Sequence, residues 1–235
     1  MYWDLLYIQR ISKEKVYRND EGKWMKEKAK MPNNIEFWGR MAKVYDLFMK
    51  KDAKAYEIMY DLIRSRLNPE MRVLELATGT GEIALHICQY VREVRATDYS
   101  EDMIHIAQKK SYSSSIYFEV MDACNLTYEE NSFDIVIIAN GLHVIPEPEI
   151  VIENIKKVLK KGGLIIAPTF TSISGSKNKL VRKFMERVGF RTYSKWDLEA
   201  YCNFLQENGI EIERRELIKA TFDLMYVEGK FKENF

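Results

Sequence analysis

The sequence predicts an α/β protein with a doubly wound, mostly parallel sheet of seven strands. Short apolar runs alternate with stretches of helical periodicity along most of the chain, and a glycine-rich turn follows the first of these runs. Strands that alternate with helices form parallel sheets that helices cover on both faces. A glycine-rich turn at the carboxyl end of a strand lets the backbone approach a ligand closely, so the pattern also predicts where a ligand binds.

Each predicted element follows from apolar spacing and from turn residues. The strands are the apolar runs 73–77, 94–97, 116–120, 133–139, 164–167, 210–218 and 222–227. The helices between them are 82–90, 100–110 and 149–159. Two more helices over 35–67 precede the first strand, with Ile58 and Met59 among their apolar positions, and Asn68-Pro69 ends the second. The turn Lys161-Gly162-Gly163 stops the helix 149–159 and starts the next strand.

The regular alternation covers only part of the chain. Residues 1–34 are rich in charge and form an N-terminal appendage, for which a partly ordered tail, a helical lid and a dimer contact all stay open. We expect residues 35–235 to form the main domain, which has the size of a single enzyme domain. Within it, residues 171–206 interrupt the alternation with a loop and two helices, 179–188 and 195–206, and we expect this insertion to be a helical cap.

The composition is that of an ordinary globular protein. The chain has 235 residues, of which 36 are basic and 35 acidic, so its charge does not indicate a nucleic-acid partner. The three cysteines, Cys88, Cys124 and Cys202, lack C-x-x-C spacing, so we expect no metal site and reduced thiols in a cytoplasmic protein. Asp4 argues against a secretory signal, and the longest apolar run, 133–139, is far too short for a transmembrane segment.

The most informative segment runs from an apolar strand through the glycine-rich turn into a helix. Its spacing Gly79-x-Gly81-x-x-Ala84 also satisfies the dinucleotide fingerprint, so the turn alone does not identify the ligand. Glu75, just before the turn, would repel a pyrophosphate and suit a cationic ligand, unless it is a structural residue bonded to loop amides. Asp98 ends the next strand, 17 residues after Gly81, near the spacing of roughly 20 residues expected of an acid that binds ribose hydroxyls.

Several ordered motifs carry a resemblance to a known family. They are Glu75-x-Ala77-x-Gly79-Thr80-Gly81, Asp98-Tyr99-Ser100-x-x-Met103, Asp122-Ala123, Phe133-Asp134-Ile135-Val136 with Asn140-Gly141-Leu142, and Leu159-Lys160-Lys161-Gly162-Gly163. Over residues 45–167 the chain resembles the class I S-adenosylmethionine-dependent methyltransferases, and it is similar to their ubiquinone/menaquinone C-methyltransferase-like group. This resemblance implies a Rossmann-like methyltransferase fold. The chain departs from the family at Ala77, where many relatives carry glycine, but the remaining glycines still permit the turn.

The resemblance also implies a cofactor, S-adenosylmethionine, and the residues that bind it. The glycine-rich turn would hold the cofactor, Asp98 its ribose and the pair Asp122-Ala123 its adenine, while the loop after 133–139 would lie beneath the reactive methyl group. The implied cofactor-binding residues are Glu75, Ala77, Thr78, Gly79, Thr80, Gly81, Asp98, Tyr99, Met103, Asp122, Ala123, Asn140 and Leu142.

Two residues are candidates for catalysis. His143 follows the loop under the methyl group and could act as a general base, because imidazole titrates near neutral pH. A histidine that only packs in the loop is the alternative. Tyr45 resembles a family element that folds over the cofactor, and its alternative role is a core aromatic residue.

We therefore expect methyl transfer to a small-molecule or lipid-like acceptor by in-line displacement, a reaction that needs alignment and exclusion of water rather than a metal. Two other functions stay open, a nicotinamide-dependent oxidoreductase and a cofactor-binding module without catalysis. A nucleic-acid substrate is disfavoured by the near-zero net charge and by the lack of an Asn/Asp-Pro-Pro-aromatic tetrapeptide after 133–139. A homodimer is an open expectation.

Overall fold

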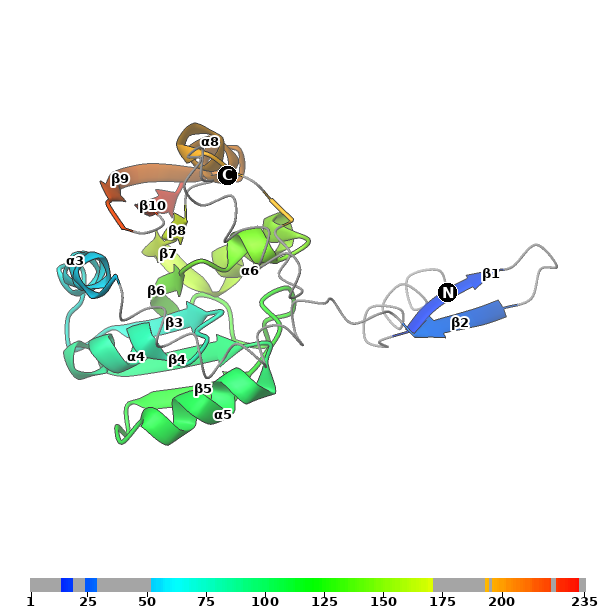
Figure 1. The fold of residues 1–235 in the computed structure, drawn as a ribbon, viewed down its shortest axis with the longest axis horizontal. Helices are drawn as coiled ribbons and strands as arrows, with labels where there is room; N and C mark the ends of the chain where they lie inside the picture. Colours follow the sequence, from blue (N-terminus) through cyan, green and yellow to red (C-terminus); the bar gives the residue numbers. More distant parts are fainter. Residues whose placement is uncertain are drawn as a thin grey trace.

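The computed structural model describes residues 14–18, 24–28, 52–170, 193–194, 196–220 and 223–232, and its elements are drawn in Figure 1. Tyr45, the first of the two helices expected over 35–67 and the expected helix 179–188 lie outside the described residues. Among the described residues, no helix is both long and apolar enough to cross a membrane.

The centre of the fold is one large sheet, and it confirms the predicted class. Its strands are β3 (Arg72–Leu76), β4 (Glu93–Asp98), β5 (Ile116–Val120), β6 (Phe133–Ile138), β7 (Leu159–Ile166), β8 (Thr169–Phe170), β9 (Ile210–Ile218) and β10 (Leu224–Phe231). They pair in the order β5-β4-β3-β6-β7-β10-β8, and β9 pairs with β10. Strands β3 to β7 run parallel, whereas β10 is antiparallel to β7, β8 and β9.

The one unpredicted strand of this sheet is β8, and it continues the line of β7. Ile166 pairs with Glu228 of β10, the Ala167 amide donates to the Val227 carbonyl at 2.8 Å, and Thr169 then pairs with Met225. Pro168 stands between β7 and β8 and has no amide proton to donate. It therefore interrupts the pairing with β10 between two strands that otherwise lie in one line. The expected seven strands and the observed eight therefore describe the same sheet.

Helices cover both faces of the sheet, and the strands bury alternate residues against each face. The helices are α3 (Ala53–Arg64), α4 (Glu82–Ile87), α5 (Glu101–Lys110), α6 (Pro148–Val158) and α8 (Leu198–Glu207), with 3-10 turns at Cys88–Tyr90 and Leu142–Val144. Along β3, Val73 packs in the apolar cluster that holds α3 and α4, whereas Leu74 and Leu76 pack in the cluster that holds α6 and α8. This two-sided burial explains why the strands are nearly continuous apolar runs.

Two predicted details are wrong. Ile58 does not belong to the buried face of α3 but is 48% exposed, because the helix buries Ala55, Tyr56, Met59 and Ile63 instead. The predicted turn Lys161–Gly163 is an irregularity inside β7: the strand begins at Leu159, paired with Phe133, and the regular register resumes at Leu164, paired with Ile135.

The structure describes part of the N-terminal appendage. Its described residues form strands β1 (Glu14–Arg18) and β2 (Trp24–Lys28), which pair antiparallel from Glu14 opposite Lys28 to Arg18 opposite Trp24. The described residues of this segment thus form two paired strands, and the roles of tail, lid and dimer contact stay predictions for residues 1–34.

A buried ion pair links the segment after α3 to β10. Glu228 has a fully buried side chain, and its Oε1 accepts a hydrogen bond of 2.8 Å from Nε of Arg66 as well as one from Nη2. The hydroxyl of Tyr226 donates to the other oxygen of Glu228 at 2.6 Å. Both oxygens of this carboxylate are thus bonded, as a buried charge requires.

Candidate functional site

The glycine-rich turn connects β3 to α4 in a left-handed conformation. Ala77, Gly79 and Gly81 all have positive φ, at 53°, 57° and 82°. The turn is fixed by two backbone bonds, from the Thr78 amide to the Thr97 carbonyl at 2.9 Å and from the Gly81 amide to the Thr78 carbonyl at 3.0 Å. A Cβ on Gly81 would come within 2.8 Å of the Phe118 ring, whereas one on Gly79 would meet nothing within 4 Å. The turn is therefore packed on the Gly81 side and open at Gly79.

A small cavity lies beside this open side, at the carboxyl ends of β3 and β6. The chain leaves β3 for β4 on one side and reaches β6 on the other, so the cavity occupies the switch point at which open α/β sheets bind ligands. Its lining comes from α3, from the β3–α4 turn and from the end of β6. The lining residues are Tyr56, Met59, Glu75, Ala77, Thr78, Gly79, Thr80, Glu82, Ile83, Ala139 and Asn140.

Glu75 supplies a buried carboxyl group to this cavity. Its residue is 2% exposed, and its Oε2 makes no hydrogen bond within the described part of the chain. Burial raises the pKa of Glu75 to about 8; the neighbouring Thr78 hydroxyl and Ala84 amide lower it by less, and the charges of Asp98 and Glu82 raise it further. Glu75 is therefore mostly protonated at neutral pH until a cation enters the cavity and favours the ionised form.

Asp98 braces the same turn from the end of β4. Its Oδ2 accepts a hydrogen bond from the Gly79 amide at 2.8 Å, and its Oδ1 accepts one from the Ser100 amide at 2.9 Å. Burial raises the pKa of Asp98, and the two amide bonds oppose that shift. Ser100 is in turn the N-cap of α5, because its hydroxyl accepts from the Met103 amide. Asp98 thus joins two loops that both leave the carboxyl edge of the sheet.

The loop after β6 forms the opposite wall of the cavity. Asn140 has φ of 54°, its amide donates to the Pro168 carbonyl at 2.8 Å, and its Oδ1 accepts from the Phe170 amide at 3.0 Å. A Cβ on Gly141 would lie 3.0 Å from the Cβ of Ala77. The loop after β6 is therefore tied to β8 and packs closely against the glycine-rich turn.

The remaining predicted residues of this loop do not line the cavity. Leu142 is 1% exposed and packs in the apolar cluster with α6 and α8. His143 lies in the 3-10 turn, and its Nδ1 is 3.3 Å from Oγ1 of Thr169. Burial lowers the pKa of His143 to about 4, so the expectation that it titrates near neutral pH is wrong. His143 is a neutral imidazole at physiological pH.

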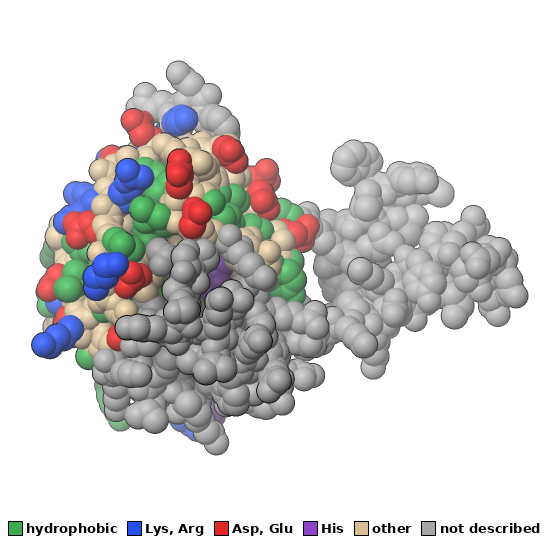
Figure 2. All heavy atoms as spheres, turned by 45° about the horizontal axis from the view of Figure 1, so that its top comes forward, with side chains coloured by type: hydrophobic (Ala, Val, Ile, Leu, Met, Phe, Trp, Pro, Cys, Tyr) green, Lys and Arg blue, Asp and Glu red, His purple; other side chains and the backbone are tan. Residues whose placement is uncertain are grey.

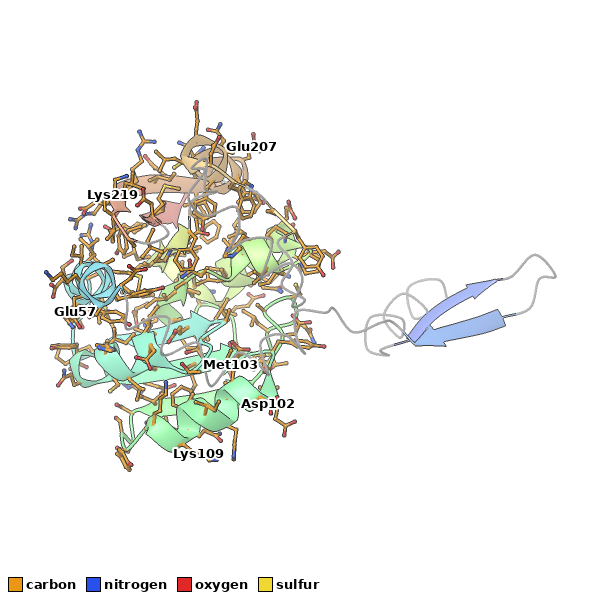
Figure 3. All side chains as sticks on the ribbon, in the orientation of Figure 1. Glu57, Asp102, Met103, Lys109, Glu207 and Lys219 are labelled. Carbon is orange, nitrogen blue, oxygen red and sulfur yellow. The ribbon has the colours of Figure 1, made fainter. Side chains whose placement is uncertain are left out.

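The lining of the cavity does not include the predicted cofactor-binding residues Tyr99, Met103, Asp122 and Ala123. Tyr99 is 42% exposed directly after β4, and Met103 is 2% exposed; Figure 3 shows Met103 on the sheet side of α5, with Asp102 and Lys109 pointing away. Oδ1 of the exposed Asp122 accepts from the Cys124 amide at 2.8 Å. The Ala123 carbonyl accepts from Nδ2 of Asn154 at 3.2 Å.

These positions still belong to the same edge of the sheet. The Met121 amide donates to the Asp98 carbonyl at 3.0 Å, so the segment after β5 follows the carboxyl end of β4. Of the residues predicted to bind a cofactor, the structure brings Glu75, Ala77, Thr78, Gly79, Thr80 and Asn140 into the cavity lining.

Sequence reasoning missed five lining residues, Tyr56, Met59, Glu82, Ile83 and Ala139. Met59 and Ile83 carried only the signal of apolar helix positions, which does not separate core from cavity. Tyr56 carried no signal, because α3 reaches the cavity through tertiary packing. Glu82 directly follows Gly81, and its position as the first residue of the helix is a signal that could have identified it.

Comparisons with known proteins agree on one family. Residues 74–167 match the model of a methyltransferase domain. The chain is 30% identical over 190 residues to the ubiquinone/menaquinone biosynthesis C-methyltransferase of Rhizobium leguminosarum bv. trifolii, covering 76% of this chain and 69% of the relative. It is 28% identical over 203 residues to the demethylmenaquinone methyltransferase of Staphylococcus saprophyticus, covering 77% of this chain and 85% of that one.

Solved structures share the fold at low identity. A SAM-dependent methyltransferase from Aquifex aeolicus superposes with a TM-score of 0.64 at 16% identity, covering 81% of this chain and 97% of its own. The magnesium protoporphyrin IX methyltransferase of Synechocystis, solved with bound SAH, superposes with a TM-score of 0.60 at 18% identity, covering 79% of this chain and 87% of its own. At these identities the likeness concerns the fold alone.

Proposed function

Because the chain belongs to the class I S-adenosylmethionine-dependent methyltransferases, we propose that it methylates a flat, apolar, quinone-like molecule. The names of its relatives, ubiquinone/menaquinone and demethylmenaquinone methyltransferases, support this acceptor class. The acceptor is small or lipid-like and not a nucleic acid. On the face shown in Figure 2, Lys and Arg side chains lie close to Asp and Glu side chains. This mixture of charges does not favour the binding of a polyanion such as a nucleic acid.

The chemistry of the cavity lining supports the methyl donor over a dinucleotide. The described lining residues include two carboxyl groups, Glu75 and Glu82, and no Lys, Arg or His. Glu82 is paired with Lys110 at 2.6 Å, which leaves the buried Glu75 as the group that lacks a partner at Oε2. A pyrophosphate would meet no positive side chain among these lining residues, whereas the ammonium or sulfonium of S-adenosylmethionine would favour the ionised form of Glu75 and be attracted to it. This carboxyl group is the observation that carries the proposal.

The residues of the site would hold the donor in three parts. Glu75 attracts its cationic end, the open backbone at Gly79 leaves room for close approach, and Asp98 lies beside Gly79 for the ribose hydroxyls. S-adenosylmethionine supplies a methyl group that is already activated, because its leaving group is a neutral thioether. The protein's own task is therefore to align the acceptor and to exclude water.

His143 and Tyr45 are the proposed groups for the acceptor side. His143 is neutral, so it can accept a hydrogen bond or a proton, but its low pKa makes it a weak base. The role that fits this chemistry is to orient an acceptor hydroxyl through its other ring nitrogen while Thr169 holds Nδ1. Tyr45 keeps the role that the family resemblance implies. A cytoplasmic location and a homodimer stay predictions.

Calorimetry on the full chain tests the donor. We expect S-adenosylmethionine and S-adenosylhomocysteine to bind and NAD to bind far more weakly; tighter binding of NAD would contradict the proposal.

Asp98→Ala should weaken donor binding by about 2–3 kcal/mol, as expected when charge-assisted hydrogen bonds are lost. Ser100→Ala is the matched control, because it removes the α5 cap bond and leaves the Asp98 carboxylate in place.

The acceptor needs a separate assay. The protein is incubated with donor carrying a labelled methyl group and with a reduced quinone that lacks one ring methyl group, and the extracted lipid is examined by mass spectrometry. Label in the quinone supports the acceptor class. Label in protein or RNA of a total extract, with none in the quinone, would reject that class while leaving the methyltransferase assignment intact.

A further inference from the structure

Two polar side-chain atoms at the cavity are buried and make no hydrogen bond within the described part of the chain. They are Oγ1 of Thr78 and Oε2 of Glu75, in residues that are 7% and 2% exposed, and both residues line the cavity. A buried polar atom that lacks a partner is costly, so native proteins leave few such atoms and usually complete them with a bound molecule. These two atoms therefore indicate a bound group inside the cavity.

The two atoms are neighbours in a well-fixed part of the site. The Thr78 hydroxyl lies close enough to the Glu75 carboxyl group to lower its pKa, yet no hydrogen bond joins Oγ1 to it. The Thr78 amide donates to the Thr97 carbonyl at 2.9 Å, and the Thr78 carbonyl accepts from the Gly81 amide at 3.0 Å. Glu75 belongs to β3, which is paired on both sides. A group that enters between the two side chains can therefore bond to both of them.

The neighbouring carboxyl groups already have partners. Glu82 is paired with Nζ of Lys110 at 2.6 Å. Both oxygens of Asp98 accept hydrogen bonds from backbone amides. Glu75 is thus the acidic group at this cavity with an oxygen that a bound cation would complete.

Hydrogen-bonding capacity distinguishes the two cationic groups of the donor. An ionised carboxylate only accepts hydrogen bonds, and a threonine hydroxyl can accept them too, so a group that completes both atoms donates. The ammonium of S-adenosylmethionine carries N–H bonds enough for both, and its charge favours the ionised form of Glu75. The sulfonium has no hydrogen on sulfur, so it would leave both acceptors unbonded.

We propose that Thr78 is a binding residue for the ammonium group of the donor, with its hydroxyl accepting one N–H bond while Glu75 accepts another. This inference rests on the proposed function, because it takes S-adenosylmethionine as the donor. It adds that the amino-acid end of the donor, and not its sulfonium, occupies this part of the cavity.

The test measures dissociation constants on the full chain by calorimetry for three ligands. They are S-adenosylmethionine, S-adenosylhomocysteine, which keeps the ammonium but has a neutral sulfur, and the analogue of S-adenosylhomocysteine that lacks the amino group. In the natural protein the analogue should bind about 100-fold more weakly than S-adenosylhomocysteine, because two hydrogen bonds from a charged group are lost.

Thr78→Val removes the hydroxyl and keeps the shape of the side chain. It should weaken S-adenosylmethionine and S-adenosylhomocysteine alike by about tenfold and should leave the analogue unaffected, so the ratio between the last two falls about tenfold. Thr78→Ser, which keeps a hydroxyl, should retain the ratio of the natural protein. A merely structural role of Thr78 would lower the melting temperature without changing this ratio.

Thr97→Val is the matched control. Thr97 is 1% exposed and its hydroxyl donates to the Glu75 carbonyl at 3.3 Å, but it is not part of the cavity lining, so the ratio should not change. Equal binding of S-adenosylhomocysteine and the analogue to the natural protein, or a loss in Thr78→Val confined to S-adenosylmethionine, would overturn the inference. Failure of the natural protein to bind S-adenosylmethionine and S-adenosylhomocysteine would instead overturn the proposed function.

Discussion

At the scale of single residues, Glu75 combines a charge-bearing group with nearly complete burial. Its pKa is raised from an ordinary 4.5 to about 8, chiefly by burial. The folded protein therefore keeps a proton that the unfolded chain releases. This contribution to stability is fully present below pH 4.5 and is lost as the pH rises to about 8.

Glu75→Gln should consequently flatten the pH dependence of stability. Glutamine stays neutral, so the variant should avoid a loss of about 1 kcal/mol per pH unit between the two pKa values of Glu75. Thermal melts of both proteins, without ligand, between about pH 5 and about pH 8 measure this difference. Parallel melting curves across that range would contradict a raised pKa. Glu130→Gln, at an exposed position, is the control.

The sequence identified Glu75, Gly79 and Asn140 as site residues but not their electrostatics. Position before a glycine-rich turn is a local property that spacing reveals. Protonation depends instead on how deeply the group is buried, and for Glu75 that depends on α3 and α4, whose Tyr56 and Ile83 share the cavity lining. His143 was misjudged for the same reason, because its low pKa comes from burial alone.

At the scale of elements, the ion pair between Arg66 and Glu228 holds the segment after α3 against β10. The two partners differ in environment, since the side chain of Arg66 is 38% exposed and that of Glu228 is fully buried. Removing the arginine leaves a buried carboxylate without its countercharge. Removing the carboxylate's charge leaves an arginine that water can reach.

The two single substitutions should therefore be unequal. Arg66→Met should cost about 3–5 kcal/mol in the free energy of unfolding, whereas Glu228→Gln should cost about 1–2 kcal/mol. Urea unfolding of each variant and of the double variant measures both values, and the double variant should be more stable than Arg66→Met alone. Equal losses in the free energy of unfolding for the two single variants would show that the burial of Glu228 does not determine the loss. The exposed pair Lys219–Asp223 is the control, and Lys219→Met should change stability by less than about 1 kcal/mol.

Elements with strong local signals were predicted well. Strand β5 (Ile116–Val120) has the predicted bounds, and the helix predicted over 100–110 is α5 (Glu101–Lys110) with Ser100 as its N-cap. The start of β7 was missed because Lys160 to Gly163 reads as a turn, and only the pairing of Leu159 with Phe133 makes it part of a strand. β8 has two residues, too few to produce a pattern.

At the scale of the whole molecule, the alternation of strands and helices predicted the class of sheet but not its order. Nothing in the sequence shows that β10 pairs between β7 and β9. That arrangement depends on long-range contacts such as the pair of Glu228 with Arg66, which are 162 positions apart. The hairpin of β1 and β2 was likewise not predicted, because charged residues dominate its sequence.

Deletion of residues 1–30 tests whether the N-terminal appendage covers the site as a lid, one of the three roles left open for it. Among the described residues, β1 and β2 pair only with each other, so the large sheet keeps all its pairings without them. We expect the melting temperature to change by only a few degrees, and S-adenosylhomocysteine to dissociate faster when followed by stopped-flow displacement. A truncated protein with an unchanged dissociation rate would argue against a cover.

The place of β10 also decides which parts of the sheet open as one unit. In the described structure β9 pairs only with β10, from Leu224 opposite Ile218 to Phe231 opposite Ile210, and has no bond to any other strand. β9 therefore cannot keep its ladder once β10 has left. Amide hydrogens of both strands should exchange with solvent through a common opening, whereas β3 and β6, each paired on two sides, stay protected until the domain unfolds. The cavity lies at the ends of these two strands. We therefore expect the strands that carry the cavity to stay folded after β9 and β10 have opened.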